Sequence, residues 1–301
     1  RSPGKSEVKV RVGGVGVGYF DGLLIKGEYQ IQPPLPFIPG SSFAGVVEEV
    51  GESVTRLQPG QRIAAFTLLG ALAEKITLSA DACFPLPDEV APEKAANFMI
   101  AYATALYGLR ELAHVQPGES VLVLGGAGTT GSTAIEVARA LGARVIACDS
   151  TEEKRARCEA AGAETTVDYT DPEWRKQVKA AAGGRGVDAV FDPVGGDLSE
   201  PALRCLAPGG RFLVVGFVTG IAKIPMNLPL LKRIHIIGVN WGGEVMENPA
   251  VVGPVVQQLV DWSLSGAIRA EPDHIYSLEE AGEAFRALFE RRSAGQVVIR
   301  P

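Results

Sequence analysis

One stretch constrains the fold of this chain more than any other, residues 120–147, which read SVLVLGGAGTTGSTAIEVARALGARVIA. It opens with the apolar run Val121–Leu124, which is typical of a strand buried on both faces. The glycine cluster Gly126-x-Gly128-x-x-Gly131 follows directly, and apolar residues at helical spacing come next. Val145–Ala147 then resumes strand character. The stretch therefore predicts one strand–helix–strand unit with a glycine turn after its first strand.

The glycine turn predicts a site for the pyrophosphate of a dinucleotide. Gly126 would permit the tight turn, Gly128 would let the backbone approach the pyrophosphate, and Gly131 would let the helix pack closely on the strand. The helix N-terminus adds unpaired N–H groups and the positive end of the helix dipole, and both favour bound phosphate.

The rest of the chain divides into two patterns. Short strands with glycine and proline punctuation, and a short helix over Tyr19–Lys26, fill residues 8–86 and predict a compact, barrel-like β domain. A helix is predicted over 93–109, and strands then alternate with helices up to residue 239, as in a doubly wound parallel sheet. The tail is too short for a domain of its own and is expected to return to the β domain. We therefore predict an α/β protein with a β-rich domain of residues 1–98 and 245–301 and an inserted nucleotide domain of residues 99–244.

Composition excludes several classes of protein. The 301 residues include 29 basic and 35 acidic side chains, a net charge of −6 that argues against nucleic acid or an anionic membrane as the main partner. No apolar run approaches the roughly 20 residues of a membrane span. The four cysteines form no CxxC pair and the first residues lack a signal peptide pattern, so we expect a cytoplasmic protein with reduced thiols. Because the sequence opens on Arg1 without a methionine, we expect that earlier residues are missing from it.

With these motifs placed, the whole chain resembles the medium-chain dehydrogenase/reductase superfamily and, more narrowly, its zinc-free, zeta-crystallin-like NADPH:quinone oxidoreductases. The resemblance implies a GroES-like catalytic domain, an inserted Rossmann domain and a homodimer joined through edge strands, here Ile234–Val239. The matching stretches are PPLPFIPGSSFAGVVEEVGESVTRLQPGQRIAAF, ATALYGLRELAHVQPGESVLVLGGAGTTG, GGRGVDAVFDPVGGD, LAPGGRFLVVGF and SAGQVVI.

The resemblance also bears on metal. Zinc-dependent relatives carry Gly-His-Glu where this chain has Gly40-Ser41-Ser42, and they carry a four-cysteine lobe that this sequence lacks. Zinc prefers thiolate and imidazole ligands, and the three histidines, His114, His235 and His274, form no ligand-like cluster in the sequence. We therefore expect no metal.

Family position implies the remaining site residues. Tyr19, Tyr29 and Asp21 would shape the substrate pocket, and core packing is the alternative role for the aromatic residues. Relatives usually have Asn at Gly18 and Glu at Ser42, so activity would be altered or lost if those positions are essential. The expected cofactor contacts beyond the three glycines are Thr104, Thr129, Thr130, Pro193, Val194, Phe217, Val218, Asn240 and Trp241.

The choice between NADP(H) and NAD(H) depends on the end of the second strand of the nucleotide domain. Asp149 follows Gly131 by 18 residues, and a carboxylate there would bind the ribose 2′-hydroxyl and repel a 2′-phosphate, which favours NAD(H). Ser150, Lys154 and Tyr169 match positions through which the family holds the 2′-phosphate of NADPH, and Arg291 or Arg292 would assist. From family position we expect NADP(H) rather than NAD(H).

Three functions follow from these residues. The first is a zinc-independent reductase that transfers hydride from NAD(P)H to a quinone or a similar conjugated carbonyl. The second is a 2-enoyl or alkenal reductase, in which Tyr19 or Tyr29 would donate a proton. The third is an NADPH-binding protein without turnover, favoured by the departures at Gly18 and Ser42.

Overall fold

The computed structural model describes residues 1–290, 292 and 294–301, and the chain divides into two compact units. Unit 1 comprises Arg1–Ala103, Ala250–Gly266 and Ala270–Pro301. Unit 2 comprises Thr104–Pro249 and Ala267–Arg269. The predicted α/β class is confirmed, because one unit holds a mixed sheet and the other an all-parallel sheet.

Unit 2 is built on a six-stranded parallel sheet in the order β11-β10-β9-β6-β7-β8. Its strands are β6 (Ser120–Leu124), β7 (Arg144–Asp149), β8 (Thr165–Asp168), β9 (Val187–Asp192), β10 (Leu206–Val214) and β11 (His235–Gly238). All five residues of β6 are buried, as the apolar run predicts for a central strand.

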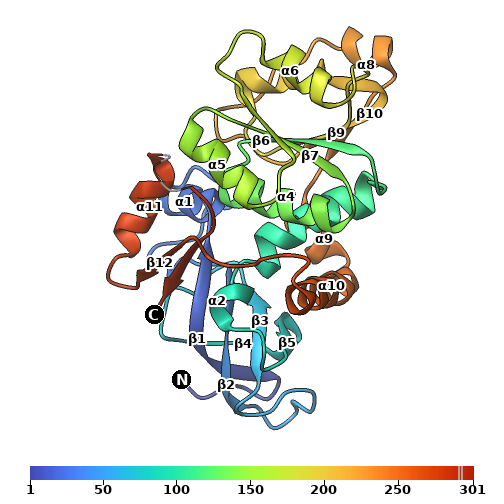
Figure 1. Ribbon diagram of the computed structural model, residues 1–301. Helices are drawn as coiled ribbons and strands as arrows, with labels where there is room; N and C mark the ends of the chain where they lie inside the picture. The colour runs from blue at the N-terminus through green and yellow to red at the C-terminus, as the bar shows by residue number, and fades with distance from the viewer. Residues whose placement is uncertain (291, 293) are drawn as a thin grey trace. The chain divides into compact units, whose positions relative to one another are not determined.

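Helices cover both faces of this sheet, with α4 and α5 on one side and α6 and α8 on the other (Figure 1). Their bounds are α4 (Thr129–Ala140), α5 (Glu152–Ala160), α6 (Trp174–Ala181), α7 (Ser199–Leu203), α8 (Asn227–Lys232) and α9 (Trp241–Glu247), with a 3₁₀ turn, η4, at Gly196–Leu198. Trp174 and Val178 of α6 pack with Leu122, Leu124 and Phe212 of the sheet in one buried cluster.

Unit 1 is built on a seven-stranded sheet in the order β12-β13-β1-β2-β3-β5, with β4 paired to β1. Its strands are β1 (Glu7–Val17), β2 (Ser42–Val50), β3 (Arg62–Phe66), β4 (Lys75–Ser79), β5 (Cys83–Pro85), β12 (His274–Ser277) and β13 (Val297–Arg300). Val8, Val10 and Val12 are buried while their neighbours are more exposed, which is the alternation of a half-buried strand. The tail enters this sheet, because β13 pairs antiparallel with β1.

The helical elements of unit 1 are α1 (Tyr19–Lys26), α2 (Pro92–Ala95), α10 (Val252–Ser265) and α11 (Ala281–Phe289), with 3₁₀ turns η1 (Ala80–Ala82) and η5 (Pro249–Val251). α1 has the predicted bounds. The single helix predicted over 93–109 is wrong, since the chain there forms α2, a π-helical segment η2 (Phe98–Tyr102), α3 (Ala103–Leu106) and a second π-helical segment η3 (Tyr107–Leu112). Among the described residues, no helix is both long and apolar enough to cross a membrane.

Candidate functional site

The carboxyl edge of the unit 2 sheet gathers most of the predicted cofactor residues. The glycine turn follows β6, Asp149 and Ser150 follow β7, and Tyr169 follows β8. Val194 follows β9, and Phe217 with Val218 follows β10. Because β6 is flanked by β9 on one side and by β7 on the other, this edge contains the switch point where doubly wound sheets bind ligands.

The glycine turn differs in one detail from the prediction. The glycine with a left-handed backbone is Gly125, with φ of 57°, whereas the prediction assigned the tight turn to Gly126. Gly126 is required for packing instead, because a Cβ there would lie 2.8 Å from the Cys158 sulfur. A Cβ at Gly131 would overlap the Gly125 carbonyl oxygen, whereas a Cβ at Gly128 would lie 3.4 Å from that oxygen, an ordinary contact. Of the three glycines of the motif, only Gly128 could therefore accept a Cβ without a close contact.

These residues fit a pyrophosphate. Helix α4 begins directly after Gly128, which has no side chain to cap the helix N-terminus. The first N–H groups of a helix have no partner within the helix, so they point out of its end. Thr129 and Thr130 occupy the first helical positions, where their backbone N–H groups and hydroxyls would meet an anion.

Asp149 is buried at the end of β7, and its carboxylate faces the glycine turn. One oxygen accepts a hydrogen bond from the Ala127 backbone N–H at 3.1 Å, and the other accepts from the Ser150 N–H at 2.8 Å. The Gly126 N–H also donates to the Cys148 carbonyl at 3.2 Å. Asp149 thus braces the glycine turn against the end of β7, a role that its position in the sequence alone does not reveal.

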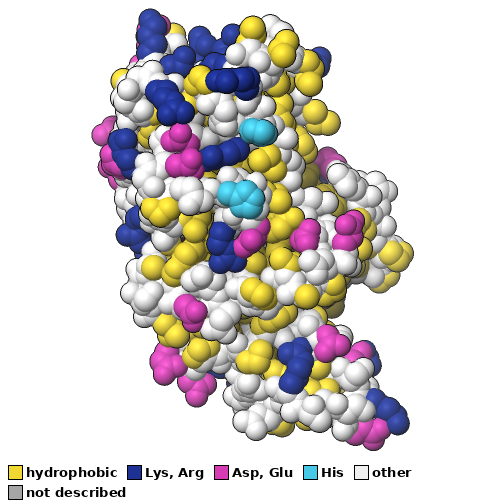
Figure 2. All heavy atoms as spheres, turned by 90° about the vertical axis from the view of Figure 1, so that its right-hand side faces the viewer, with side chains coloured by type: hydrophobic (Ala, Val, Ile, Leu, Met, Phe, Trp, Pro, Cys, Tyr) yellow, Lys and Arg dark blue, Asp and Glu magenta, His cyan; other side chains and the backbone are white. Residues whose placement is uncertain are grey.

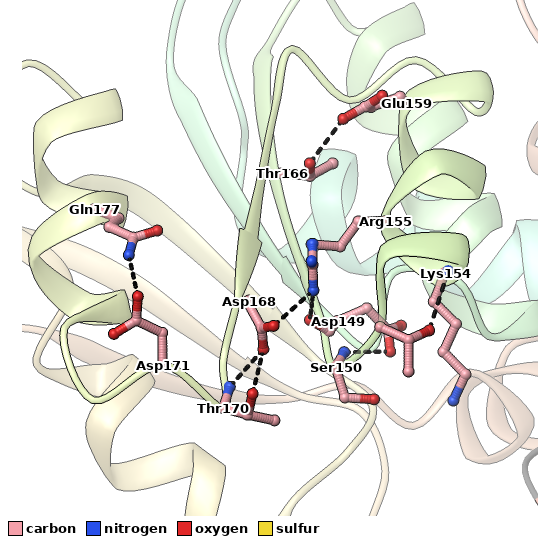
Figure 3. Close-up of polar contacts among 11 residues, drawn as sticks. Asp149, Ser150, Lys154, Arg155, Glu159, Thr166, Asp168, Thr170, Asp171 and Gln177 are labelled. Carbon is pink, nitrogen blue, oxygen red and sulfur yellow. Dashed lines mark hydrogen bonds and ion pairs between the residues drawn. The ribbon is translucent and has the colours of Figure 1, made fainter.

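An ion pair that the sequence interpretation missed lies beside Asp149. Arg155 of α5 contacts Asp168, the last residue of β8, at 2.9 Å and reaches the Asp149 carbonyl oxygen at 3.5 Å (Figure 3). The Thr170 hydroxyl and backbone N–H, with a smaller contribution from Arg155, hold the pKa of Asp168 below its usual range. The sequence feature that could have predicted this ion pair is an acidic residue, Asp168, at the end of a predicted parallel strand.

A second missed residue organises the loops after β9 and β10. Asp192 is buried and accepts hydrogen bonds from the Val194 and Gly195 N–H groups, both at 2.9 Å, and from the Ser199 hydroxyl at 2.5 Å. The Thr219 N–H donates to the Val194 carbonyl at 2.9 Å, so the loop after β9 in turn holds the loop after β10. Phe217 in that second loop is half-exposed.

The other predicted residues of unit 2 have mixed surroundings. Tyr169 is partly buried against the core cluster of the sheet. Asn240 caps α9 by accepting the Gly243 N–H at 3.1 Å, and Trp241 is buried with its ring 5.5 Å from that of Tyr107. Thr104 lies in α3 and is half-buried. Arg291 lies outside the described residues.

In unit 1, the Asp21 side chain is buried and its carboxylate is hydrogen-bonded to other groups of the protein. Its carboxylate accepts the Ser41 hydroxyl at 2.8 Å and the Gly18 N–H at 3.0 Å, and burial raises its pKa to about 6. Ser42 is also buried and donates to the Ala96 carbonyl at 2.6 Å. Both serine hydroxyls of the Gly40-Ser41-Ser42 triplet are therefore bound within the protein.

The two predicted pocket tyrosines pack against other rings. Tyr19 lies edge-on to Phe289 with centroids 5.5 Å apart, and Tyr29 lies edge-on to Phe20 at 4.6 Å. Burial raises the pKa of Tyr29. An open apolar depression of about 520 Å³ lies elsewhere in unit 1, lined by Pro36, Phe37, Ile38, Leu69 and Gly70.

Metal ligands are not assembled in the part of the chain that the structure describes. Within residues 1–290, 292 and 294–301, no group of three or more His, Cys, Asp or Glu side chains is placed to hold a metal ion. The four cysteines are buried and free, and burial raises the pKa of Cys83 and of Cys158 to about 12. Such thiols stay protonated at neutral pH.

Comparison with known proteins agrees with this architecture. Residues 4–88 match the alcohol dehydrogenase GroES-like domain model, and residues 129–257 match the zinc-binding dehydrogenase model. Quinone oxidoreductase-like protein 2 of Mus musculus is 36% identical, over 99% of this chain and 86% of that protein.

Solved structures share the fold along the whole chain. The Escherichia coli quinone oxidoreductase complexed with NADPH superposes with a TM-score of 0.91 at 27% identity, covering 100% of this chain and 92% of that one. The CurK enoyl reductase superposes with a TM-score of 0.89 at 26% identity, covering 100% and 92%. With its GroES-like and Rossmann-type sheets and its 36% identity to a quinone oxidoreductase-like protein, the chain belongs to the medium-chain dehydrogenase/reductase superfamily of oxidoreductases, among its quinone oxidoreductase-like members.

Proposed function

We propose that this protein transfers a hydride from NAD(P)H to a quinone or a similar conjugated carbonyl compound. The observation that carries the proposal is the glycine turn at the switch point of the parallel sheet, where α4 begins directly after Gly128 with no side chain capping its N-terminus. The names of its relatives support the acceptor class, since both the mouse protein and the Escherichia coli structure are described as quinone oxidoreductases or as similar to them.

Bound NAD(P)H would supply the hydride from its nicotinamide ring. We propose that Thr129, Thr130 and Gly131 hold the pyrophosphate through backbone N–H groups at the start of α4, and that Gly126 and Gly128 shape the turn beside it, because their own N–H groups donate to the Cys148 and Gly125 carbonyls. Asp192 would position the loops that carry Val194, Phe217 and Val218. Its carboxylate accepts hydrogen bonds from the loop after β9, and that loop is hydrogen-bonded to the loop after β10. Thr104 and Asn240 complete the proposed cofactor contacts.

Ser150, Lys154 and Tyr169 are the residues proposed to meet a 2′-phosphate if NADPH binds, with Arg291 as a further candidate. The Escherichia coli complex supports NADPH as a cofactor of proteins with this fold. In this chain the negative carboxylates of Asp149 and Asp168, at the ends of β7 and β8, would repel the 2′-phosphate of NADPH.

We propose that the reaction is zinc-independent. The triplet Gly40-Ser41-Ser42 offers hydroxyls in place of the imidazole and carboxylate of zinc-dependent relatives, and both hydroxyls already donate to groups of the protein. We propose that residues 1–98 and 245–301 form a catalytic domain and that residues 99–244 form a nucleotide-binding domain. The protein would act as a homodimer joined through Ile234–Val239.

Steady-state oxidation of NADH and NADPH with a panel of quinones and enones tests this function. We expect turnover with at least one quinone, and we expect it to survive dialysis against a chelator. A folded protein that oxidises neither cofactor with any acceptor would contradict the proposal. Tight cofactor binding without turnover would instead indicate a nucleotide-binding protein, as the departures at Gly18 and Ser42 allow.

An enoyl reductase is the second candidate, supported by the likeness to the CurK enoyl reductase. Such a reaction needs a proton donor for the carbon next to the carbonyl group. Tyr29 is one candidate donor, since a tyrosine hydroxyl is protonated at neutral pH and burial raises the pKa of this one further, and Tyr19 is the alternative donor. Loss of enone reduction in Tyr29→Phe or Tyr19→Phe, with quinone reduction retained, would favour this reaction.

A further inference from the structure

Two acidic residues lie side by side at the carboxyl edge of the unit 2 sheet. Asp149 and Asp168 are register partners in the parallel pair β7–β8, and each is the last residue of its strand. In doubly wound sheets the end of the strand after the glycine-turn helix meets the adenosine ribose, and the substituent on its 2′-oxygen distinguishes NADH from NADPH. The pair therefore lies where that substituent is read.

Arg155 is a cation at this place, and it is already bound. Its guanidinium contacts the Asp168 carboxylate at 2.9 Å and the Asp149 backbone carbonyl at 3.5 Å. Both side chains of the pair are mostly buried, with 22% of Arg155 and 32% of Asp168 exposed, so solvent screens the pair only in part. Figure 3 shows the Lys154 ammonium directed away from the pair.

The surrounding charge is negative. Residues 149–155 together with residue 168 contain four acidic side chains, Asp149, Glu152, Glu153 and Asp168, and two basic ones, Lys154 and Arg155, so their sum is −2. A 2′-phosphate brings about two further negative charges at neutral pH. Like charges repel one another, whereas the ribose 2′-hydroxyl of NADH is neutral and can donate a hydrogen bond to a carboxylate.

We propose that Asp168 is a specificity-determining residue, which withholds Arg155 from a 2′-phosphate and so makes this chain prefer NADH to NADPH. Asp168 acts through Arg155, whereas Asp149 adds its own negative charge beside it. The inference rests on the proposed function, because it assumes that a nicotinamide dinucleotide binds at the glycine turn. It departs from the NADP(H) preference expected from family position.

The test is Asp168→Asn, with dissociation constants for NADH and NADPH measured by fluorescence titration or calorimetry without an acceptor. Thr170 donates to one oxygen of Asp168 and Arg155 contacts the other, so asparagine can keep the Thr170 bonds while its amide repels the guanidinium. We expect wild type to bind NADH more tightly. In the variant we expect NADPH affinity to rise about tenfold, the effect of one regained charge-assisted hydrogen bond, and NADH affinity to change less than about twofold.

Two further variants separate specificity from stability. Adding Arg155→Gln to Asp168→Asn should cancel the gain for NADPH, because the released cation is then absent. Glu164→Gln removes the partner of Arg144 at the opposite end of β7, an ion pair of 2.9 Å, and should leave both affinities unchanged.

The outcomes are distinct. An equal change for both cofactors in Asp168→Asn, no change, or tighter binding of NADPH by wild type would overturn the inference and leave the proposed function standing. No binding of either cofactor by folded wild type would overturn both.

Discussion

At the scale of single residues, the most consequential side chains are acids that accept hydrogen bonds from backbone N–H groups. Asp149, Asp192 and Asp21 each accept backbone N–H groups and are each buried. A carboxylate satisfied in this way holds a loop in one conformation at a modest cost in desolvation. The loops of the candidate site are thus ordered from inside the protein.

Asp21 gives a prediction about pH. Burial raises its pKa to about 6, above the ordinary value of 3.8, so the folded state binds the proton more tightly than the unfolded state. Its stabilising contribution is therefore complete below about pH 4 and is lost as the pH rises through about 6. In Asp21→Asn this dependence should vanish, so the variant should gain about 2 kcal/mol in unfolding free energy relative to wild type between pH 4.5 and 7.5.

Urea unfolding of both proteins across this pH range provides the measurement. All other titrating groups are shared, so the difference between the two curves isolates Asp21. Parallel curves for wild type and variant would show that the carboxyl titrates normally.

Asp192 gives a second prediction at this scale. In Asp192→Ala the Val194 and Gly195 N–H groups and the Ser199 hydroxyl lose their shared acceptor. Leaving buried donors unsatisfied costs roughly 1–3 kcal/mol each, so we expect a loss of about 3 kcal/mol or more in unfolding free energy. Backbone amide hydrogen exchange should also speed up in residues 194–196 and 217–220. Unchanged exchange in the second loop would contradict the coupling between the loops.

At the scale of elements, the glycine turn and α4 behave as one device. The turn is closed by Gly125 in a left-handed conformation, braced by Asp149, and packed so tightly that Gly131 has no room for a side chain. Gly128, two residues from Gly126 in the same turn, has that room. The glycines of this motif are therefore needed for different reasons, Gly131 for close packing and Gly128 not for packing.

Paired substitutions test this division. Gly131→Ala should destabilise the protein by several kcal/mol, because its Cβ would collide with the Gly125 backbone, which cannot move aside cheaply. Gly128→Ala should change the unfolding free energy by less than about 1 kcal/mol but weaken dinucleotide binding, because its methyl group would occupy the space before α4. Thermal unfolding and cofactor titration of the two variants separate the effects. Equal destabilisation by both would refute this assignment.

The segment after α2 is the element that the sequence misrepresents. Apolar residues at helical spacing predict one helix over 93–109, but the chain widens into π-helical turns at Phe98–Tyr102 and Tyr107–Leu112. Tyr102 within the first turn is fully buried and accepts a hydrogen bond from Gln296 at 2.7 Å. This partner lies 194 residues further along the chain, and periodicity encodes no such distant contact.

At the scale of the whole molecule, one edge of the unit 2 sheet is available for assembly. β11 lies at one end of the unit 2 sheet and pairs with β10, and within the described residues no other strand pairs with it. Ile236 on β11 is 41% exposed, and neighbouring segments expose Leu230 and Leu231. Figure 2 shows one face of the molecule, on which hydrophobic side chains reach the surface between charged ones. An unprotected edge with apolar neighbours is suited to pairing with a second copy.

The proposed homodimer gives the last prediction. Ile236→Lys should convert a dimer to a monomer, because a buried lysine opposite its own copy is strongly disfavoured. Ile275→Lys on β12, the edge strand of the other sheet with 49% exposure, serves as the matched control. Light scattering after size exclusion gives the mass of each variant. A dimer that survives Ile236→Lys and dissociates with Ile275→Lys would place the interface on unit 1.

The sequence by itself determined the α/β class, the strand–turn–helix unit at 120–147 and most helices and strands, because periodicity, glycine spacing and turn residues are local properties. The residues that it predicts to contact a cofactor, namely the glycine turn, Asp149, Tyr169, Val194 and Phe217, lie at or after the ends of β6, β7, β8, β9 and β10, and their cofactor role stays a prediction. Only the tertiary structure decided which groups of the protein each of these acids contacts. The pairing of Arg155 with Asp168, the turning of Asp149 onto Ala127 and the role of Asp192 depend on strand order and register, which join residues distant in the chain.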